Sequence, residues 1–403
     1  MDDAAQLVES YDILGPGQES EAMRSRAYQL CRDYLLGSWK LIDQDSMILR
    51  QIRGGLSNHL YYCALPHPHT PIAAEPSEVL LRLYGQMHGE DALENMLAES
   101  VIFTLLSERR LGPRLYGIFP GGRLEQYIPA RSLLREELCD AHLQRQIANK
   151  IARVHALDVP ISKEATWLWT SITKWLKSSA DFLRSSSMDK ELVDQLREFD
   201  GVAELNYVME LSAQVDSPVV FAHNDLQEGN ILLQKSSSSR RVALIDFEYC
   251  AYNYRGFDLA NHFGERVYGY KLDRPPYFTV HEKDYPSTNE QLTFIRPYLA
   301  AYHAARGQQV PPPIPETVSP TRSCDNRLQK WLAEATTEEE RLLKEIQVLK
   351  LAGHLFWLLW SLVQGHVSSI TFGYLEYARV RMEHYIRDKI ELEEAVEKAN
   401  RTP

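Results

Sequence analysis

The stretch between residues 219 and 258 constrains this chain more than any other part of it. It contains two short apolar runs rich in β-branched residues, VVFA at Val219–Ala222 and VALI at residues 242–245. A polar cluster follows each run: His223-Asn224-Asp225 after the first and Asp246-Phe247-Glu248 after the second. Buried strands that carry polar loops into a functional site have this pattern. We therefore expect two buried strands, each followed by a loop that contributes to one site.

The polar residues of this stretch have the spacing of a phosphoryl-transfer site. Asn230 lies five residues after Asp225, and Asp246 follows the second apolar run. In kinase-type enzymes an Asp accepts the proton of the attacking hydroxyl, while an Asn and a later Asp hold Mg²⁺ against the phosphates. In the alternative, Asp225 and Asn230 only shape a turn and Asp246 caps a helix. The complete set favours the catalytic interpretation, with Asp225 as the base and Asn230 and Asp246 as metal ligands.

Two longer runs contain these residues, FAHNDLQEGNILL and IDFEYCAYNYRGFDLANHFGE. They resemble the choline/ethanolamine kinase family, and its choline kinases most of all, with similarity from about residue 27 to about residue 387. The resemblance implies a protein-kinase-like fold of the α/β class. It has two lobes, so that strands and helices are largely segregated (α+β). We expect a small β-rich N-terminal lobe that binds ATP in residues 1–126, and a larger, mainly helical lobe with the catalytic and choline-binding residues in 127–403.

Composition limits the other classes of function that remain open. The net charge of −11 argues against a nucleic-acid partner or an anionic membrane surface. The five cysteines are scattered and lack CxxC spacing, which indicates a reducing compartment. The N-terminus lacks the features of a signal peptide, and the most apolar window, residues 355–363, is shorter than the ~20 residues of a membrane span. We expect a cytoplasmic protein without a membrane span.

The first lobe begins with a helix over residues 21–36 and a hairpin of strands at 47–52 and 60–65. Paired glycines in its turn allow a close approach of the backbone to a ligand, although a plain hairpin turn has the same composition. Choline kinases carry a similar GGxSN loop, and the resemblance therefore implies that this turn covers the ATP phosphates. The residues concerned are Arg53, Gly54, Gly55, Leu56, Ser57 and Asn58.

A third strand at residues 78–85 carries Arg82, and the helix predicted at 93–109 carries Glu99. Kinases pair a strand cation with a helical carboxylate to grip the phosphates, although a surface ion pair is the alternative. Two more strands, at 113–118 and 123–127, lead to a proline-containing lobe junction, whose backbone we expect to meet the adenine edge. The further nucleotide-binding residues that we expect are Gln126, Tyr127, Ile128, Pro129, Arg131 and, toward nucleotide or metal, Gln227.

The second lobe has apolar residues at helical spacing over most of its length. We expect helices at residues 134–157, 165–185, 190–215, 288–305 and 327–367. Residues 236–239 form a hairpin loop, and PPPIP at 311–315 lies in a linker within the lobe. Trp167, Trp169 and Trp175 are interpreted as packing residues.

The acceptor pocket is predicted from an aromatic-rich segment near the C-terminus. Trp357 and Trp360 are three residues apart and share a helix face, and the next helix brings Phe372, Tyr374 and Tyr377. Such a set forms either a buried aromatic cluster or a cage that binds a quaternary ammonium through the ring faces. The resemblance favours the cage and adds Tyr249, Glu265 and Tyr270. One departure is Gly264-Glu265-Arg266, where choline kinases usually have Cys-Glu-Trp.

The resemblance implies a choline kinase that transfers the γ-phosphoryl group of ATP to choline and uses Mg²⁺. Phosphocholine would then enter phosphatidylcholine synthesis by the CDP-choline route, and a homodimer is expected. An ethanolamine kinase or a dual choline/ethanolamine kinase is the nearest alternative. Aminoglycoside phosphotransferases share the catalytic spacing but line their pockets with carboxylates. A catalytically dead scaffold would have lost Asp225, Asn230 or Asp246, and all three are present.

Overall fold

The computed structural model describes residues 20–52, 58–84, 92–185, 190–235, 240–307, 326–368 and 370–401. The chain divides into two compact units, Met1–Leu133 with Gly229–Glu248, and Leu134–Glu228 with Tyr249–Pro403. The sequence predicts a boundary near residue 126, where the first strands end. The unit found here continues to Leu133 and takes in a later segment, because a strand at Ala130–Ser132 pairs with one at Ile231–Lys235.

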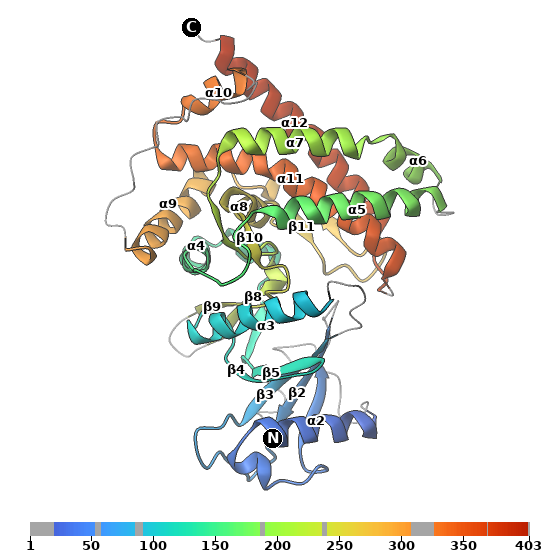
Figure 1. Cartoon of the computed structure of the whole chain (residues 1–403), viewed down its shortest axis with the longest axis vertical. Coiled ribbons are helices and arrows are strands. Elements are labelled where there is room, and N and C mark those ends of the chain that lie inside the picture. The colour runs from blue at the N-terminus through green and yellow to red at the C-terminus, as the bar shows by residue number, and fades with distance from the viewer. Residues whose placement is uncertain are drawn as a thin grey trace. The chain divides into compact units, whose positions relative to one another are not determined.

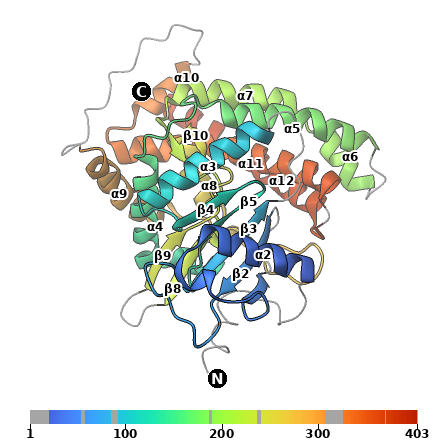
Figure 2. The same cartoon turned by 60° about the horizontal axis from the view of Figure 1, so that its bottom comes forward.

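The first unit contains an antiparallel sheet of five strands in the order β1-β2-β3-β5-β4. Its strands are β1 (Ile48–Ile52), β2 (Asn58–Ala64), β3 (Glu78–Tyr84), β5 (Gly122–Gln126) and β4 (Leu115–Phe119). Helix α2 (Glu21–Tyr34) lies across this sheet (Figure 2) and buries Ala27 and Cys31 against it. The short helix η1 (Gly37–Lys40) adds Trp39 to the same apolar core. The helix, hairpin and strands predicted for this part of the chain are confirmed.

The two faces of this sheet differ because side chains alternate along each strand. Leu81 of β3 and Leu124 of β5 are register partners, and both belong to the apolar core that includes α2. Arg82 and Arg123 are the neighbouring register partners and therefore point to the opposite face. Helix α3 (Ala92–Glu108) covers that face, since Phe103 packs 4.0 Å from the guanidinium carbon of Arg123. The buried charges of the unit thus lie between α3 and the sheet.

A second sheet of three strands completes the first unit. It consists of β6 (Ala130–Ser132), β8 (Ile231–Lys235) and β9 (Arg240–Leu244), all antiparallel. Ile128, Ala130 and Leu232 form its small apolar cluster. The predicted hairpin around residues 236–239 is confirmed by the pairing of β8 with β9, although the loop itself is outside the described residues.

The second unit is mainly helical, as predicted (Figure 1). Its helices are η2 (Arg135–Cys139), α4 (Ala141–His155), α5 (Thr166–Ser185), α6 (Lys190–Glu198), α7 (Gly201–Val215), α8 (Arg255–Gly264), η4 (Glu282–Asp284), α9 (Thr288–Ala305), α10 (Asn326–Ala333), α11 (Glu338–Val367) and α12 (Tyr374–Arg401). Two strand pairs accompany them, β7 (Val219–Ala222) with β10 (Ala251–Tyr254), and β11 (Tyr268–Gly269) with β12 (Thr279–Val280). Helix η3 (Glu228–Asn230) links β7 to β8 at the boundary of the units.

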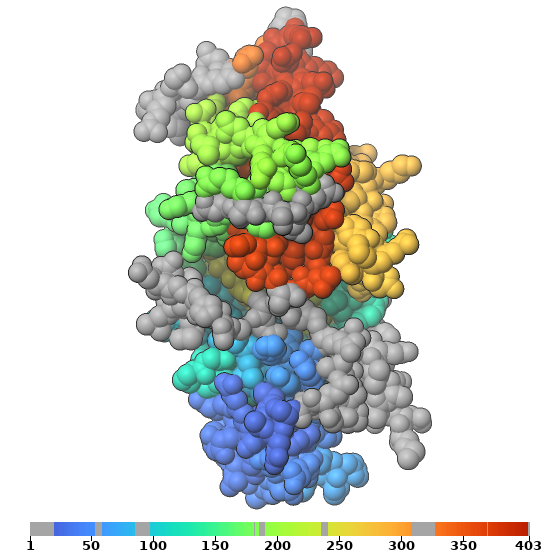
Figure 3. Space-filling view, turned by 90° about the vertical axis from the view of Figure 1, so that its right-hand side faces the viewer, coloured from blue at the N-terminus to red at the C-terminus, as the bar shows by residue number. Residues whose placement is uncertain are grey.

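Helix α11 is the centre of this unit and packs against α5, α7, α8 and α12. By length and composition it is apolar enough to cross a membrane, but 78% of its most apolar window is buried inside the protein. Its apolar residues are therefore accounted for by the core of the unit. On the surface of the unit, α6 lies beside α12 (Figure 3).

Three helices predicted as continuous are interrupted in the structure, each at a residue that caps the next helix. The side chain of Asp140 accepts from two backbone N–H groups at the start of α4, and Asp200 does so once at the start of α7. Thr337 forms a capping box with Glu340 at the start of α11. Because a short polar side chain competes for the first N–H groups of a helix, it starts a new helix rather than continuing the old one. The continuous helices expected at 134–157, 190–215 and 327–367 are corrected accordingly.

Candidate active site

The first unit holds an alternating chain of buried charges on β3, β5 and α3. Arg82 donates to Glu125 at 3.3 Å, and Arg123 donates to the other oxygen of Glu125 at 2.7 Å. Arg123 also reaches Glu99 of α3 at 2.5 Å. Burial disfavours the charged form of Glu125, but Arg82 and Arg123 outweigh it and lower the pKa of this carboxyl. The network is therefore ionised and holds the Arg82 guanidinium in one orientation.

This arrangement differs from the expected direct pair between Arg82 and Glu99. Glu99 pairs with Arg123 of β5, while Arg82 on β3 pairs with Glu125 and with Asp246. Arg123 and Glu125 were absent from the predicted site. Their alternation in the strand GRLEQ, which places both on one face, is the sequence signal that identifies them.

The proposed metal ligands Asn230 and Asp246 also lie in the first unit. The backbone N–H of Ile245 donates to the carbonyl of Asn230 at 3.0 Å, which places the chain before Asp246 beside Asn230. Asn230 is buried, whereas the Asp246 side chain is 31% exposed and lies 3.6 Å from Arg82. Asp246 adopts a left-handed backbone conformation with φ of 62°, which is uncommon outside glycine and turns the chain sharply after β9.

These oxygen donors fit Mg²⁺, which is commonly held by one or two protein carboxylates together with phosphate oxygens and water. Within the described residues, no three His, Cys, Asp or Glu side chains converge on one point. A magnesium ion held by Asn230 and Asp246 would therefore complete its coordination with nucleotide oxygens and water.

The residues expected to contact the nucleotide divide into two groups. The loop of Arg53, Gly54, Gly55, Leu56 and Ser57, with the side chain of Asn58, lies outside the described residues. At the junction, the side chains of Tyr127 and Ile128 are buried, Tyr127 against Tyr62 with ring centroids 4.6 Å apart. Pro129 is exposed, and Arg131 is half-buried. Because Tyr127 and Ile128 point into the core, they are available to a nucleotide only through their backbone.

Gln126 at this junction is tied to Arg114 at the base of β4. The side-chain oxygen of Gln126 accepts from the backbone N–H of Arg114 at 3.2 Å. The backbone N–H of Gln126 donates to the Arg114 carbonyl at 2.7 Å. Both bonds hold the end of β5 in register, and the N–H of Gln126 is therefore already occupied.

The loop that carries Asp225 belongs to the second unit and is anchored on α8. Buried Asp258 accepts from the backbone N–H groups of His223 and Asn224, both at 2.8 Å, and from Nε2 of His155 at 2.8 Å. Burial raises the pKa of Asp258, but these donors outweigh it and the pKa is lowered. An ionised carboxylate beneath two successive N–H groups fixes the backbone immediately before half-buried Asp225. Asp258 and His155 are positioning residues that the prediction missed.

Two further contacts hold the same loop. The amide of Asn224, whose φ is 66°, donates to the Tyr249 carbonyl at 2.9 Å and accepts from Asn253 at 2.8 Å. After Asp225, Nδ1 of His262 lies 2.9 Å from the carbonyl of buried Leu226. Burial lowers the pKa of His262 to about 4, so the imidazole is neutral and its Nδ1–H donates to that carbonyl. The loop is thus held on both sides of Asp225, and Gln227 follows as a half-buried residue.

All eight residues predicted for the acceptor pocket lie in the second unit, and a continuous series of contacts joins them. The Trp357 and Trp360 rings are 5.4 Å apart, and Trp360 is followed by Tyr374 at 6.2 Å. The series continues from Tyr374 to Phe372 at 5.1 Å and from Phe372 to Tyr377 at 5.7 Å. Three further bonds join Tyr249 to Trp360 at 3.1 Å, Tyr270 to Tyr377 at 2.9 Å and Tyr270 to Glu265 at 2.7 Å.

The members of this aromatic cluster differ in how far they are buried. Trp357 and Tyr377 are buried, with 7% and 2% exposure. Half-buried members are Tyr249, Tyr270, Trp360, Phe372 and Tyr374. Phe372 precedes α12 rather than lying on it, which corrects the expected helix. A fully buried core would leave no aromatic face available, so the half-buried members are those able to meet a ligand.

The carboxylate of this cluster is already neutralised. Glu265, 2% exposed, receives Nη2 of Arg381 at 2.5 Å on one oxygen and the Tyr270 hydroxyl on the other. Arg381 also donates to the Tyr377 hydroxyl at 2.9 Å and lies 3.8 Å from the centre of the Tyr268 ring. Arg381 was not predicted, although its place one helical turn after Tyr377 puts the two residues on one face of α12.

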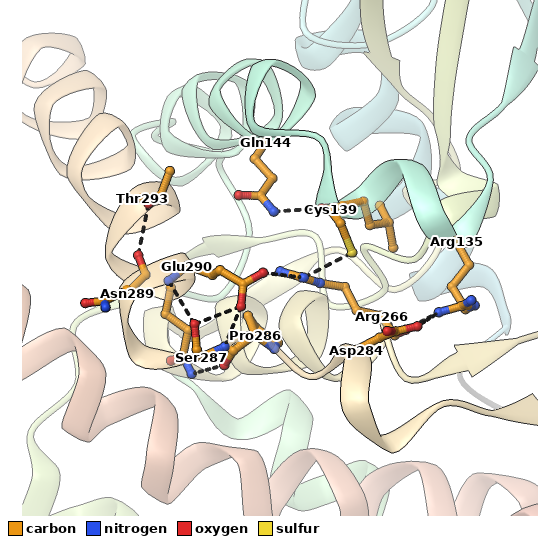
Figure 4. A network of polar contacts seen from close by, with 12 residues as sticks. Arg135, Cys139, Gln144, Arg266, Asp284, Pro286, Ser287, Asn289, Glu290 and Thr293 are labelled. Atoms are coloured by element: carbon orange, nitrogen blue, oxygen red, sulfur yellow. Dashed lines mark hydrogen bonds and ion pairs between the residues drawn. The ribbon is translucent and has the colours of Figure 1, made fainter.

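Arg266, which stands where choline kinases usually have Trp, makes contacts that are separate from those of Glu265. Figure 4 shows Arg266 extending to Glu290 at the start of α9 and to Cys139 at the end of η2. Its Nη2 lies 3.0 Å from the Glu290 carboxylate and 3.0 Å from the Cys139 sulfur. Glu290 closes the capping box of α9 with Ser287, whose hydrogen bonds together with Arg266 lower the Glu290 pKa to about 2. Arg266 therefore connects η2 and α9.

Comparison with known proteins identifies the family of the chain. The family model for choline/ethanolamine kinase matches residues 49–386. The rat choline/ethanolamine kinase is 43% identical over 375 residues, which are 93% of this chain and 88% of the relative. Mouse choline kinase alpha is 39% identical and covers 94% of this chain and 83% of its own.

A solved structure shows the same fold. The choline kinase of Cryptosporidium parvum superposes with a TM-score of 0.70 at 25% identity, over 92% of this chain and 97% of its own. The predicted protein-kinase-like fold, with a β-rich N-terminal region and a mainly helical remainder, is confirmed. From the family match and these relatives, the chain belongs to the choline/ethanolamine kinase family, and it is an ATP-dependent kinase that acts on an alcohol.

Proposed function

We propose that this protein is a choline kinase, which transfers the γ-phosphoryl group of ATP to the hydroxyl of choline. The observation that carries the proposal is the state of the polar groups in the aromatic cluster. Both oxygens of Glu265 are bonded, and the hydroxyls of Tyr249, Tyr270 and Tyr377 each have a partner within the cluster. A trimethylammonium group has no N–H to donate and needs only ring faces, which the half-buried aromatic residues offer.

A primary ammonium is less well matched to this pocket. Ethanolamine brings three N–H donors, and each donor that loses water without gaining an acceptor costs free energy. The acceptors nearest the rings already bond to Arg381 or to one another, which leaves fewer lone pairs for such donors. We therefore place choline before ethanolamine, with a dual choline/ethanolamine kinase as the second candidate.

In the proposed reaction the hydroxyl oxygen of choline bonds to the γ-phosphorus, and Asp225 accepts the proton of that hydroxyl. The bond from this phosphorus to the bridging oxygen breaks, and ADP leaves with phosphocholine as the other product. Asn230 and Asp246 would hold Mg²⁺, which when bound neutralises charge on the β- and γ-phosphates. Arg82, oriented by Glu125, would contact the phosphates, and Asp258 would keep the Asp225 loop in place.

The test is steady-state kinetics with choline, N,N-dimethylethanolamine and ethanolamine measured side by side at saturating MgATP. We expect kcat/KM to fall in that order, with choline at least ~10-fold above ethanolamine, which corresponds to about 1.4 kcal/mol. Equal or higher kcat/KM for ethanolamine would contradict the preference while leaving the kinase activity intact.

The cellular setting follows from the same proposal. Phosphocholine would supply phosphatidylcholine synthesis by the CDP-choline route, and we place the enzyme in the cytoplasm as a homodimer. Within the described residues, Cys31, Cys63, Cys139 and Cys250 are not joined in disulfides, which supports a reducing compartment. Size-exclusion chromatography with light scattering tests the dimer.

A further inference from the structure

A small cavity within the second unit is lined in part by Asn261, the residue that accepts from the Trp357 indole. Its lining comes from α8, α11 and α12 and comprises Ala260, Asn261, Gly264, Lys350, Gly353, His354 and Arg381. A Cβ atom built on Gly264 or on Gly353 would meet no atom within 4 Å other than the nearby backbone of its own helix. The space has room for about one water molecule.

Asn261 connects this cavity to the proposed acceptor pocket. The indole N–H of Trp357 donates to Oδ1 of Asn261 at 2.6 Å. Because an indole N–H can only donate, this bond identifies which end of the amide is the oxygen and leaves Nδ2 as the donor end. Asn261 is 4% exposed, and its Nδ2 bonds to no protein group among the described residues.

His354 supplies the complementary atom on α11. Its Nε2 lies 2.9 Å from the carboxylate of Asp388, and its Nδ1 is buried without a protein partner in the described part of the chain. Burial lowers the pKa of His354 to about 4, so the ring is neutral near pH 7. A neutral imidazole that donates through Nε2 has a bare lone pair on Nδ1. Two residues that line the cavity, Asn261 and His354, therefore each have one buried polar atom, a donor and an acceptor respectively, that bonds to no protein group in the described part of the chain.

The chemistry of the lining selects the occupant. A cation is disfavoured by Lys350 and Arg381, and an anion is disfavoured by the lone pair of His354 Nδ1. A neutral molecule that both donates and accepts satisfies both orphan atoms, and water is the smallest such molecule.

We propose that one water molecule occupies this cavity and bridges Nδ2 of Asn261 to Nδ1 of His354, so that Asn261 is a positioning residue for Trp357. The bridge connects the indole on α11 through Asn261 of α8 to the His354–Asp388 pair, and Asp388 is itself 3.0 Å from Lys350. Rotation of the Asn261 amide would break both its bonds, which holds the indole plane. The effect on the acceptor rests on the proposed function, whereas the water site does not.

The site is tested directly by a crystal structure of the full-length protein at a resolution that shows ordered water. We expect one water peak within hydrogen-bonding distance of both Nδ2 of Asn261 and Nδ1 of His354. An empty cavity, or direct contact between the two side chains, would overturn the proposal.

The coupling is tested by a double-mutant cycle in urea unfolding with Asn261→Leu and His354→Leu. The cycle cancels the loss of the Trp357 acceptor and of the Asp388 partner, because each occurs in one single mutant and in the double mutant. A shared water predicts a coupling of at least ~5-fold in the unfolding equilibrium constant. The matched control pairs Asn261→Leu with Ser361→Ala, a buried α11 residue outside the cavity whose hydroxyl bonds the Tyr374 carbonyl at 2.7 Å. Coupling no larger than this control would contradict the bridge.

The positioning role is tested by comparing Asn261→Leu with Asn261→Asp. The Asp variant keeps an oxygen for the Trp357 indole, whereas the Leu variant removes it. We expect Asn261→Leu to raise KM for choline several-fold with KM for ATP unchanged, and Asn261→Asp to remain closer to wild type. An unchanged choline KM in a folded Asn261→Leu variant would overturn the positioning role. Absence of choline kinase activity in the wild type would instead refute the proposed function, and the water site would still be decided by the crystal structure and the cycle.

Discussion

The charged network of the first unit and the aromatic cluster of the second differ in how many charged side chains they bring together. In the first unit, acidic and basic side chains alternate along a series of ion pairs, Glu99, Arg123, Glu125 and Arg82, with Asp246 at its exposed end. In the aromatic cluster of the second unit, the carboxylate of Glu265 is paired with Arg381 and surrounded by aromatic rings and tyrosine hydroxyls.

This difference corresponds to the ligands that each region would receive. A polyphosphate needs a guanidinium that is already oriented, and a network of paired charges supplies that orientation without a free side chain to order on binding. An onium group without N–H donors needs ring faces, and a free carboxylate beside it would favour a primary amine instead. The Arg82 guanidinium of the first unit is therefore oriented to bind phosphate, whereas the Glu265 carboxylate of the second unit has its charge balanced by Arg381.

The largest effect is expected from Asp246→Ala, which changes the charged network of the first unit and leaves the aromatic cluster of the second unchanged. Arg82 keeps Glu125, but the carboxylate that would hold Mg²⁺ against the phosphates is lost. We expect no measurable turnover across a Mg²⁺ titration, with choline binding by calorimetry retained. Full activity of this variant without a divalent cation would refute the metal assignment.

Asp225→Asn tests the group proposed to accept the proton. The loop stays anchored through Asp258, so the fold and ATP binding should persist while kcat falls by at least ~10²-fold, the range of a lost acid–base group. Single-turnover kinetics and melting temperature measure the two effects. Near-normal turnover by the folded variant would remove Asp225 from the mechanism.

Arg123→Met and Arg381→Met compare the two charge arrangements directly. Arg123→Met leaves Glu99 and Glu125 without their closest cation, and we expect a loss of about 3–5 kcal/mol in the free energy of unfolding. Arg381→Met should cost less, because the Tyr270 hydroxyl still donates to Glu265. The exposed pair Arg401–Glu397 supplies the control, and Arg401→Met should change stability little. Equal losses at Arg123 and Arg381, measured in urea, would contradict the comparison.

Trp360→Leu separates an aromatic cage from a packing cluster. Leucine keeps apolar volume but lacks the ring quadrupole, which contributes ~0.5–2 kcal/mol per cation contact. We expect KM for choline to rise several-fold, KM for ATP to stay unchanged and ethanolamine to be less affected. Trp175→Leu is the matched control, since Trp175 packs 4.7 Å from Phe356 and should affect stability without changing the substrate ranking. Parallel changes in choline and ATP parameters for Trp360→Leu would indicate a packing role.

The smallest effect concerns acid stability. His262 and His354 are buried and neutral, and burial lowers the pKa of each from 6.5 to about 4. Their contribution to stability is present above pH 6.5 and is lost as the pH falls toward 4, because the unfolded chain binds their protons first. In the first unit the pKa of Glu125 is lowered from 4.5. The contribution of Glu125 to the stability of the folded protein is therefore present above pH 4.5 and is lost only as the pH falls below that value.

Hydrogen-exchange protection factors between pH 7 and pH 4.5 measure this difference. Protection of α8 and α11 should decline before protection of β3 and β5. The variant His262→Gln can still donate to the Leu226 carbonyl and should reduce the decline in α8. Simultaneous loss of protection in both units would contradict the expectation.

Local sequence patterns were sufficient for most of the elements. Strand β7 at Val219–Ala222 and helix α9 at Thr288–Ala305 have the predicted bounds. Periodicity failed at Asp140, Asp200 and Thr337, because an apolar repeat continues across a cap that only hydrogen bonding reveals. The roles of Asp225, Asn230 and Asp246 rest on motif and spacing, and they stay predictions until the mutants are measured.

The sequence by itself determined the family, the fold and the residues that its motifs contain, because these depend on spacing along the chain. Only the tertiary structure decided the partners. In the tertiary structure Glu99 pairs with Arg123 rather than with Arg82, and Glu265 pairs with Arg381. Asp258 accepts hydrogen bonds from the backbone immediately before Asp225. Glu265 and Arg381 are separated by more than a hundred residues. No local pattern encodes such a pairing, because which charges meet depends on how strands and helices pack, and burial then requires that each of them find a partner.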